Sequence, residues 1–220
     1  MAAPPTLRRF VESLRPQVII ECGAHVGEDT AWMAAIPGCA IHAFEPDPRN
    51  APPAALLALP QVHWTPVAVS DRGGEVDFYP SAKLDDGRPW TESGSLRAPL
   101  EHLKQYPYVA FGERTRVRTV TLDGYCRGAG VEYVDLIWAD VQGAELDMLK
   151  GAEETIARTL WMVLELSDHE MYAGQARRAE IVAWLAERGW RIVTEEAEGP
   201  ASNALIVNER LVPDWKRHAS

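Results

Sequence analysis

The stretch VIIECGAHVG, from Val18 to Gly27, runs from apolar residues through an acid into two glycines four positions apart. This pattern predicts a buried strand that turns through a glycine loop into a helix, and such loops often hold a nucleotide-like cofactor. The spacing is not that of the dinucleotide fingerprint G-x-G-x-x-G, because His25 and Glu28 stand where its other glycines are needed.

The acids at the start of the predicted helix bear on which cofactor the loop holds. Glu28 and Asp29 favour the helix dipole, but they would repel a pyrophosphate held at that helix end. S-adenosylmethionine carries no phosphate and has a cationic sulfonium, so it tolerates acids around the loop. The alternative is that Gly23 and Gly27 only make a tight turn between the strand and the helix.

A second acid follows at the spacing that an adenosine site requires. In HAFEPDP, Glu45 ends the second predicted strand and lies 22 residues after Gly23. A carboxylate there can accept hydrogen bonds from both ribose hydroxyls. Nicotinamide and methionine cofactors share this feature, so Glu45 indicates adenosine without choosing between them. The alternative is a solvated acid in a proline-rich turn.

The elements that must position these residues alternate between strands and helices. The strand candidates are Val18–Cys22, Ala40–Phe44, Val62–Val67, Val134–Ala139 and Met162–Leu166, and the helix candidates lie near 28–36, 52–59, 144–158 and 175–188. This rhythm predicts a parallel, doubly wound sheet. The later strands Trp190–Glu196 and Asn203–Glu209 are too close together for a helical crossover, so they must form an antiparallel hairpin.

The rest of the chain fits one domain over residues 1–220. Residues 1–16 form an N-terminal helix or extension, and 71–121 is an insertion with extra strands and a glycine- and proline-rich stretch, which we interpret as a binding loop or lid. Trp90, in this insertion, either lines a substrate pocket or anchors the loop.

Composition excludes several classes of protein. The net charge of −10 and the pI of about 5.1 argue against a basic nucleic-acid groove. No apolar run approaches the roughly 20 residues of a membrane span, and no secretory signal is visible at the N-terminus. The three cysteines are too scattered for a disulfide framework or a zinc site. We therefore expect a cytoplasmic protein with no membrane and no nucleic-acid partner, and a homodimer is a possible assembly.

Taken together, these motifs resemble those of the FkbM family of S-adenosylmethionine-dependent methyltransferases. ECGAHVGE is similar to the family's D-x-G-A-x-x-G-x loop, FEPDP to its F-E-P-x-P, and DLIWADVQGAELDMLKGAEE to its D-x-x-K-I-D-x-E-G-A-E-x-x-x-L-x-G-A. VAVSDRGGEVDFYPS, GSL, VRTVTLDGYC and MVLELSDHE resemble further family segments, so the likeness covers roughly residues 18–170. The departures are Glu21 for the usual Asp, Trp138-Ala139 for Lys-Ile, and Gln142 for an acid.

The resemblance implies a fold and a cofactor. The fold is α/β: a Rossmann-like class I methyltransferase with a mostly parallel seven-stranded sheet, helices on both faces and a C-terminal antiparallel hairpin. Glu21 is then near the amino group of the methionine portion, Thr30 near its carboxylate, and Glu45 at the ribose. The implied cofactor-binding residues are Glu21, Gly23, Ala24, Gly27, Thr30, Glu45, Ala68 and Asp140.

Methyl transfer also needs a group that removes a proton from the acceptor. The candidates just past the fourth and fifth strands are Asp140, Glu145, Glu165 and His169. Glu145 has the competing role of stabilising the start of a helix, and His169 is also consistent with an exposed loop residue. These groups are of the type that Mg²⁺ accepts, but no spacing is diagnostic and we assign no metal.

We therefore predict an S-adenosylmethionine-dependent methyltransferase that methylates a hydroxyl of a small molecule, such as a sugar or a natural-product intermediate. The acceptor rests on the resemblance alone. Two alternatives remain open at this point: an oxidoreductase that uses a nicotinamide cofactor, which the missing glycines disfavour, and a non-catalytic cofactor-binding subunit that scaffolds a biosynthetic complex.

Overall fold

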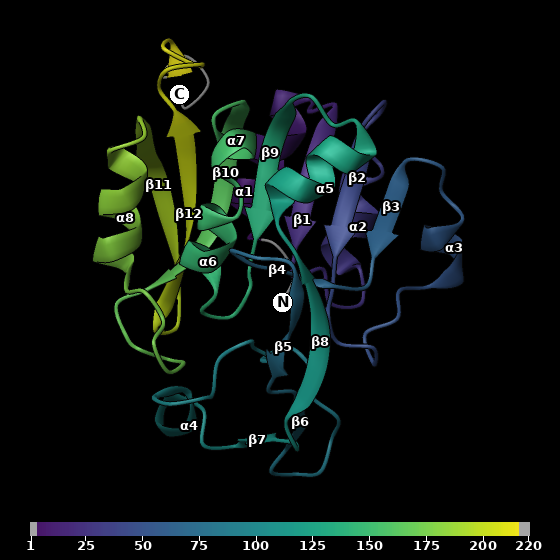
Figure 1. Ribbon diagram of the computed structural model, residues 1–220, viewed down its shortest axis with the longest axis vertical. Coiled ribbons are helices and arrows are strands. Elements are labelled where there is room, and N and C mark those ends of the chain that lie inside the picture. The colour runs from purple at the N-terminus through teal and green to yellow at the C-terminus, as the bar shows by residue number, and fades with distance from the viewer. Residues whose placement is uncertain (1–3, 216–220) are drawn as a thin grey trace.

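The computed structural model describes residues 4–215, so the first three residues of the expected N-terminal extension and the last five of the chain lie outside it. Its centre is a seven-stranded sheet in the order β11-β12-β10-β9-β1-β2-β3 (Figure 1). The strands are β1 (Val18–Cys22), β2 (Ala40–Phe44), β3 (Val62–Thr65), β9 (Val134–Ala139), β10 (Thr159–Ser167), β11 (Trp190–Glu198) and β12 (Ala201–Asn208).

The pairing of these strands confirms the predicted sheet. β1, β2, β3, β9 and β10 run parallel, whereas β12 is antiparallel to both β10 and β11. Neighbouring residues of one strand enter opposite cores: Ile19 belongs to one apolar cluster and Ile20 to the other, and both are fully buried. Apolar side chains on both faces are what a parallel sheet covered by two helical layers requires.

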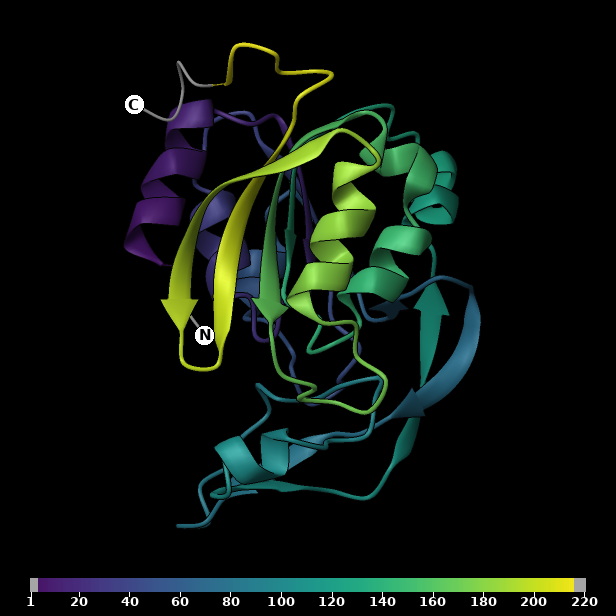
Figure 2. The same cartoon turned by 90° about the vertical axis from the view of Figure 1, so that its left-hand side faces the viewer.

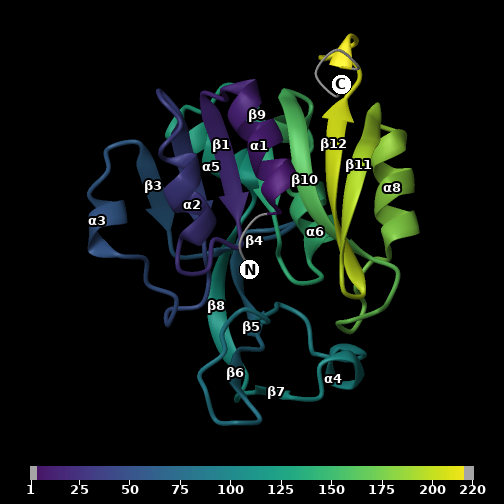
Figure 3. The same ribbon diagram turned by 180° about the vertical axis from the view of Figure 1, so that it is seen from behind.

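Helices cover both faces of the sheet, as Figures 2 and 3 show. On one face lie α1 (Pro5–Leu14) and α2 (Glu28–Met33). The other face carries α5 (Leu122–Ala129), α6 (Glu145–Lys150), α7 (Glu153–Ile156) and α8 (Arg178–Ala186), while α3 (Ala54–Leu57) lies beside β3. None of the helices within residues 4–215 is long and apolar enough to cross a bilayer.

The region after β3 forms a separate layer across the carboxyl ends of the parallel strands (Figure 2). β4 (Ala68–Val69), β5 (Gly74–Phe78) and β8 (Thr115–Val120) make a three-stranded sheet, and β6 (Ser81–Leu84) pairs with β7 (Val109–Phe111) beside the short helix α4 (His102–Gln105). The extra strands expected from GGEVDFYP and RVRTVTL are β5 and β8, which pair antiparallel. This insertion is placed where a parallel sheet binds ligands.

Several predicted elements have different ends. The helix expected over 144–158 is divided into α6 and α7 around Gly151, where the backbone of Ser70 comes so close that an added Cβ would lie 2.0 Å from its carbonyl oxygen. The strand expected over Val62–Val67 ends at Thr65, before a proline that has no N–H to donate. The other three helices are shorter than predicted. The helix expected over 28–36 is Glu28–Met33, that over 52–59 is Ala54–Leu57, and that over 175–188 is Arg178–Ala186.

Candidate active site

The glycine loop is pressed against the strand beside it. Gly23 follows β1 with φ +86°, and its N–H donates to the carbonyl of Phe44 at 2.9 Å. A Cβ at Gly23 would lie only 1.9 Å from the carbonyl oxygen of Asp140. The backbone N–H of Asp140 in turn donates to the carbonyl of Cys22 at 3.0 Å. The predicted need for glycine therefore has two causes, a left-handed backbone conformation and a backbone contact with the residue after β9.

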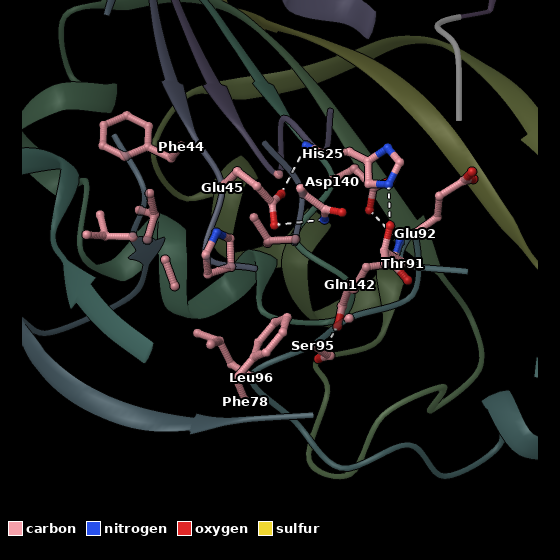
Figure 4. Close-up of a pocket in the computed structure, with 18 residues that line it drawn as sticks. His25, Phe44, Glu45, Phe78, Thr91, Glu92, Ser95, Leu96, Asp140 and Gln142 are labelled. Carbon is pink, nitrogen blue, oxygen red and sulfur yellow. Dashed lines mark hydrogen bonds between the residues drawn. The ribbon is translucent and has the colours of Figure 1, made fainter. Parts of the chain in front are cut away.

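Glu45 is held rigidly at the end of β2. One carboxylate oxygen accepts the His25 N–H at 2.9 Å (Figure 4). The other accepts the Asp47 N–H at 2.7 Å and the Asn50 side-chain amide at 3.2 Å. Burial raises the pKa of Glu45 to about 7, although these hydrogen bonds favour the charged form. The fixed carboxylate borders a cavity and can accept the two hydroxyls of a ribose there.

A first cavity, the cofactor cavity, lies between the glycine loop and the insertion. Gly23, Glu45, Ala68 and Asp140 line its sheet side. The insertion closes the other side, with Phe78, Thr91, Glu92, Ser95 and Leu96 (Figure 4). Two contacts hold the insertion against the sheet side of this cavity. The His25 Nε2 lies 2.7 Å from the Thr91 hydroxyl, and the Ser95 hydroxyl donates to the Gln142 carbonyl at 2.6 Å.

Four of the predicted cofactor residues do not border this cavity. Thr30 is fully buried, and its hydroxyl donates to the Glu21 carboxylate at 2.5 Å. Burial raises the pKa of Glu21 to about 8. Gly27 precedes α2 with φ +83° and Ala24 is buried in the core. The contact of these four residues with a cofactor stays a prediction.

Three of the predicted proton acceptors converge. Asp140, Glu145 and Glu165 each offer an oxygen, and these oxygens lie within 4.8 Å of one another. Asp140 follows β9, Glu145 begins α6 and Glu165 lies in β10, so the cluster depends on the parallel pairing of β9 with β10. Glu145 is 1% exposed and accepts the N–H groups of Val141 and Gly143 through one oxygen. Burial raises the pKa of Glu145 to about 7, and the charge of Asp140 adds to the effect.

Gln142 bridges this acidic cluster to the insertion. Its side-chain amide donates to Asp140 at 2.6 Å, and its Nε2 lies 3.5 Å from Glu165. The Tyr172 hydroxyl lies 2.6 Å from the amide oxygen of Gln142 and 3.1 Å from the Ser93 carbonyl. Gln142 has φ +51°, an uncommon conformation outside glycine that its contacts on both sides hold in place. The residue that replaces a family acid is thus a central link in the site.

A second cavity of about 260 Å³, the acceptor-side cavity, opens on the other side of Asp140. Its walls are aromatic, and its polar groups include Asp140, Glu165, Ser167 and Gln175. The two cavities share Glu92, Asp140 and Gln142. The aromatic residues are Trp90, His102, Tyr106, Tyr108 and Tyr172.

His169 lies apart from the cluster. Its Nδ1 is 3.1 Å from a carboxylate oxygen of Glu101, its side chain is 47% exposed, and it lines neither cavity. The loop turns away after β10, where the Ser167 hydroxyl accepts the His169 N–H at 3.1 Å. The structure therefore does not bring His169 together with the other three predicted proton acceptors.

Sequence reasoning missed several residues that line the cavities. Thr91 and Glu92 come from the irregular part of the insertion, and Tyr172 from the loop after β10. His25 departs from the glycine fingerprint and carries no other sequence signal, although its ring contacts Thr91 of the insertion beside the cofactor cavity. One signal was available: WTESGSL, residues 90–96, concentrates hydroxyl, acidic and aromatic side chains in a segment with no predicted strand or helix.

Comparison with known proteins places the chain in a family. The family model described as the methyltransferase FkbM domain matches residues 21–192. The chain belongs to this family. It is 37% identical over 197 residues to the 2-O-methyltransferase NoeI of Sinorhizobium fredii, covering 88% of this chain and 80% of the relative. It is 30% identical over 212 residues to the 31-O-demethyl-FK506 methyltransferase FkbM of Streptomyces tacrolimicus, covering 86% and 78%.

The fold agrees with this family. A protein of Klebsiella pneumoniae provisionally described as an O-methyltransferase has a TM-score of 0.50 to this chain at 12% identity, with 94% and 82% of the two chains covered. This FkbM-family protein is an S-adenosylmethionine-dependent methyltransferase. The nicotinamide alternative and the non-catalytic scaffold alternative are not favoured.

The buried state of Glu45 predicts pH-dependent cofactor binding. Ribose hydroxyls donate to the ionised carboxylate, so binding weakens as pH falls through the raised pKa of about 7. We expect the Kd for S-adenosylhomocysteine to be roughly tenfold higher at pH 6 than at pH 8. Calorimetric titration measures this, and Glu45→Gln is the matched control whose affinity should not follow pH in this range. An equal pH response in both proteins would remove Glu45 from the ribose site.

Removal of the Glu45 side chain should weaken cofactor binding at a pH where the carboxylate is ionised. Glu45→Ala is expected to cost about 1–3 kcal/mol of binding free energy for S-adenosylhomocysteine at pH 8, through lost charge-assisted hydrogen bonds. The measurement is calorimetric titration alongside urea unfolding, because Glu45 also accepts two backbone N–H groups. Unchanged affinity in a folded Glu45→Ala protein would contradict the assignment.

Proposed function

We propose that this methyltransferase transfers the methyl group of S-adenosylmethionine to a hydroxyl oxygen of a small molecule. The observation that carries the proposal is the junction of the two cavities at Glu92, Asp140 and Gln142. A cofactor whose ribose is held at Glu45 extends through the first cavity toward this junction, and an acceptor in the second cavity approaches it from the opposite side. Methyl transfer is an in-line displacement, so donor and acceptor must meet at one point.

The carboxylates at the junction suit the proton transfer that an alcohol needs. The hydroxyl oxygen forms a bond to the methyl carbon while the carbon–sulfur bond breaks, which releases S-adenosylhomocysteine and leaves one proton to be removed. Asp140 and Glu165 both border the acceptor-side cavity. We assign Asp140 as the group that orients the hydroxyl and receives its proton, since Asp140 also borders the cofactor cavity.

The lining of the acceptor-side cavity supports a hydroxylated ring as the acceptor. Aromatic side chains provide flat apolar walls, while carboxylate, amide and hydroxyl groups provide hydrogen-bonding partners. This combination fits a sugar or a hydroxylated natural-product intermediate. The names of NoeI and FkbM both specify transfer to oxygen.

The location of the protein is also a proposal. Cys22, Cys39 and Cys126 are all buried and free. Unpaired thiols are typical of a reducing compartment, and we propose that the protein works in the cytoplasm.

A variant of Trp90 tests the acceptor assignment. The indole N–H donates to the Ser93 hydroxyl at 3.0 Å, which fixes the ring at the wall of the acceptor-side cavity. We expect Trp90→Ala to raise the KM for a sugar acceptor roughly tenfold through the lost aromatic wall. The Kd for S-adenosylhomocysteine should stay unchanged, and Trp90→Phe should recover much of the KM.

The acceptor proposal would be contradicted by a different pattern in the same variants. A Trp90→Ala protein with normal KM for the acceptor and weakened S-adenosylhomocysteine binding would place the indole at the cofactor instead. Methyl transfer from labelled S-adenosylmethionine to an amine, with none to hydroxyl compounds, would overturn the assignment to oxygen.

A further inference from the structure

The acidic cluster at the junction has a geometry that the sequence did not predict. Ala139 and Leu164 are paired in the parallel register of β9 and β10, so Asp140, just after β9, lies beside Glu165, near the carboxyl end of β10. Glu145, at the start of α6, completes the group. Ligand oxygens on a common Mg²⁺ ion lie about 4 Å apart when they are opposite each other, and closer when they are adjacent. The three oxygens lie within 4.8 Å of one another, close enough to converge on one ion after small side-chain adjustments.

The partners of Asp140 and Glu145 are neutral. Asp140 accepts from the Gln142 amide, and Glu145 accepts from two backbone N–H groups. Within residues 4–215 neither carboxylate forms an ion pair, and the nearby Arg97 pairs with Asp147 at 2.6 Å. Closely spaced carboxylates without a cation repel one another, most strongly where water is excluded.

The buried carboxylate of Glu145 gives a separate indication that an ion binds here. Its side chain is 1% exposed, and its Oε2 is buried with no hydrogen-bond partner, while Oε1 is fully engaged by the backbone of the loop. A buried carboxylate oxygen normally has a partner, because leaving a charged acceptor unsatisfied is costly. The loop fixes the Glu145 carboxylate within the cluster of Asp140 and Glu165, and leaves one of its two oxygens available to an ion.

We propose that Asp140, Glu145 and Glu165 bind one divalent cation of the hard, oxygen-preferring class to which Mg²⁺ and Mn²⁺ belong. Three carboxylates leave coordination positions free for water or substrate. Because Asp140 and Glu165 border the acceptor-side cavity, a free position faces that cavity. The acceptor hydroxyl can then bind the cation through its oxygen, which lowers the pKa of the hydroxyl and aims the oxygen at the methyl carbon. This last consequence, unlike the cation site, rests on the proposed function.

The direct test is titration of the chelator-treated protein with Mn²⁺, followed by electron paramagnetic resonance of the free ion. We expect one Mn²⁺ per chain in the wild type, and a Kd at least tenfold higher in both Glu145→Gln and Glu165→Gln. Glu165 is only half-buried, so its variant keeps the test decisive if Glu145→Gln does not fold. Glu132→Gln, an exposed acid before β9, is the matched control and should bind as the wild type does.

Two results would overturn the cation site. Absence of Mn²⁺ binding at millimolar concentration would reject the site, and equal binding in all four proteins would place the ion elsewhere on the acidic surface. Calorimetric binding of S-adenosylhomocysteine, measured on the same samples, separates this proposal from the proposed function. Normal cofactor binding with no Mn²⁺ site would reject the cation alone.

Discussion

Asp140→Asn is expected to lower kcat by roughly 10²–10⁴-fold, the usual contribution of a positioned proton acceptor. Asparagine keeps the shape of the side chain and can still contact Gln142, but it cannot take up the proton of the acceptor or contribute a negative charge to the cluster. Because the fold around Gly23 depends on the backbone of Asp140 rather than on its side chain, the variant should remain folded.

The readout that decides the role of Asp140 is the comparison of turnover with cofactor affinity. We expect the Kd for S-adenosylhomocysteine to change much less than kcat. Asp85→Asn is a matched control, since Asp85 is exposed beyond β6 and lines neither cavity. Wild-type turnover in Asp140→Asn would contradict the proposed role, and loss of affinity with unchanged turnover at saturating cofactor would make Asp140 a binding residue only.

Gly23→Ala is expected to produce the largest loss of stability of any variant considered. The left-handed conformation at φ +86° and the 1.9 Å approach to the Asp140 carbonyl oxygen together should lower the free energy of unfolding by roughly 2–5 kcal/mol. Cofactor binding should fall as well, because the loop must move away from β9. Urea unfolding and calorimetric titration measure the two effects.

Gly38→Ala is the matched control for the backbone conformation alone. Gly38 has φ +78°, but an added Cβ there meets nothing within 4 Å. Its expected loss is about 1–2 kcal/mol, from the left-handed conformation only. Equal destabilisation by the two substitutions would show that the contact between Gly23 and Asp140 contributes nothing.

The parts of the site that could be predicted are those set by local pattern. The apolar run of β1 followed by Gly23, and the acid ending β2, both depend on a few consecutive residues and on the common edge of a parallel sheet. Asp140 and Glu165 were predictable for the same reason, because Asp140 follows one buried strand and Glu165 lies near the carboxyl end of the next. The sequence also indicated the C-terminal hairpin, since the connection was too short for any other pairing.

The parts that could not be predicted depend on contacts between distant segments. Thr91 reaches the cofactor cavity only because the insertion folds back onto His25, 66 residues earlier in the chain. The Tyr172 hydroxyl lies in the site because it contacts Gln142 and the Ser93 carbonyl. His169 lies outside the site, where its ring contacts Glu101. These placements follow from the packing of irregular segments, for which the sequence carries no periodic signal.

A crystal structure with S-adenosylhomocysteine tests the central claim most directly, namely that donor and acceptor meet where the two cavities join. We predict that both ribose hydroxyls donate to Glu45, and that the cofactor sulfur lies at the junction formed by Glu92, Asp140 and Gln142, facing the acceptor-side cavity. A ribose away from Glu45, or a sulfur that faces away from the aromatic walls, would contradict the account.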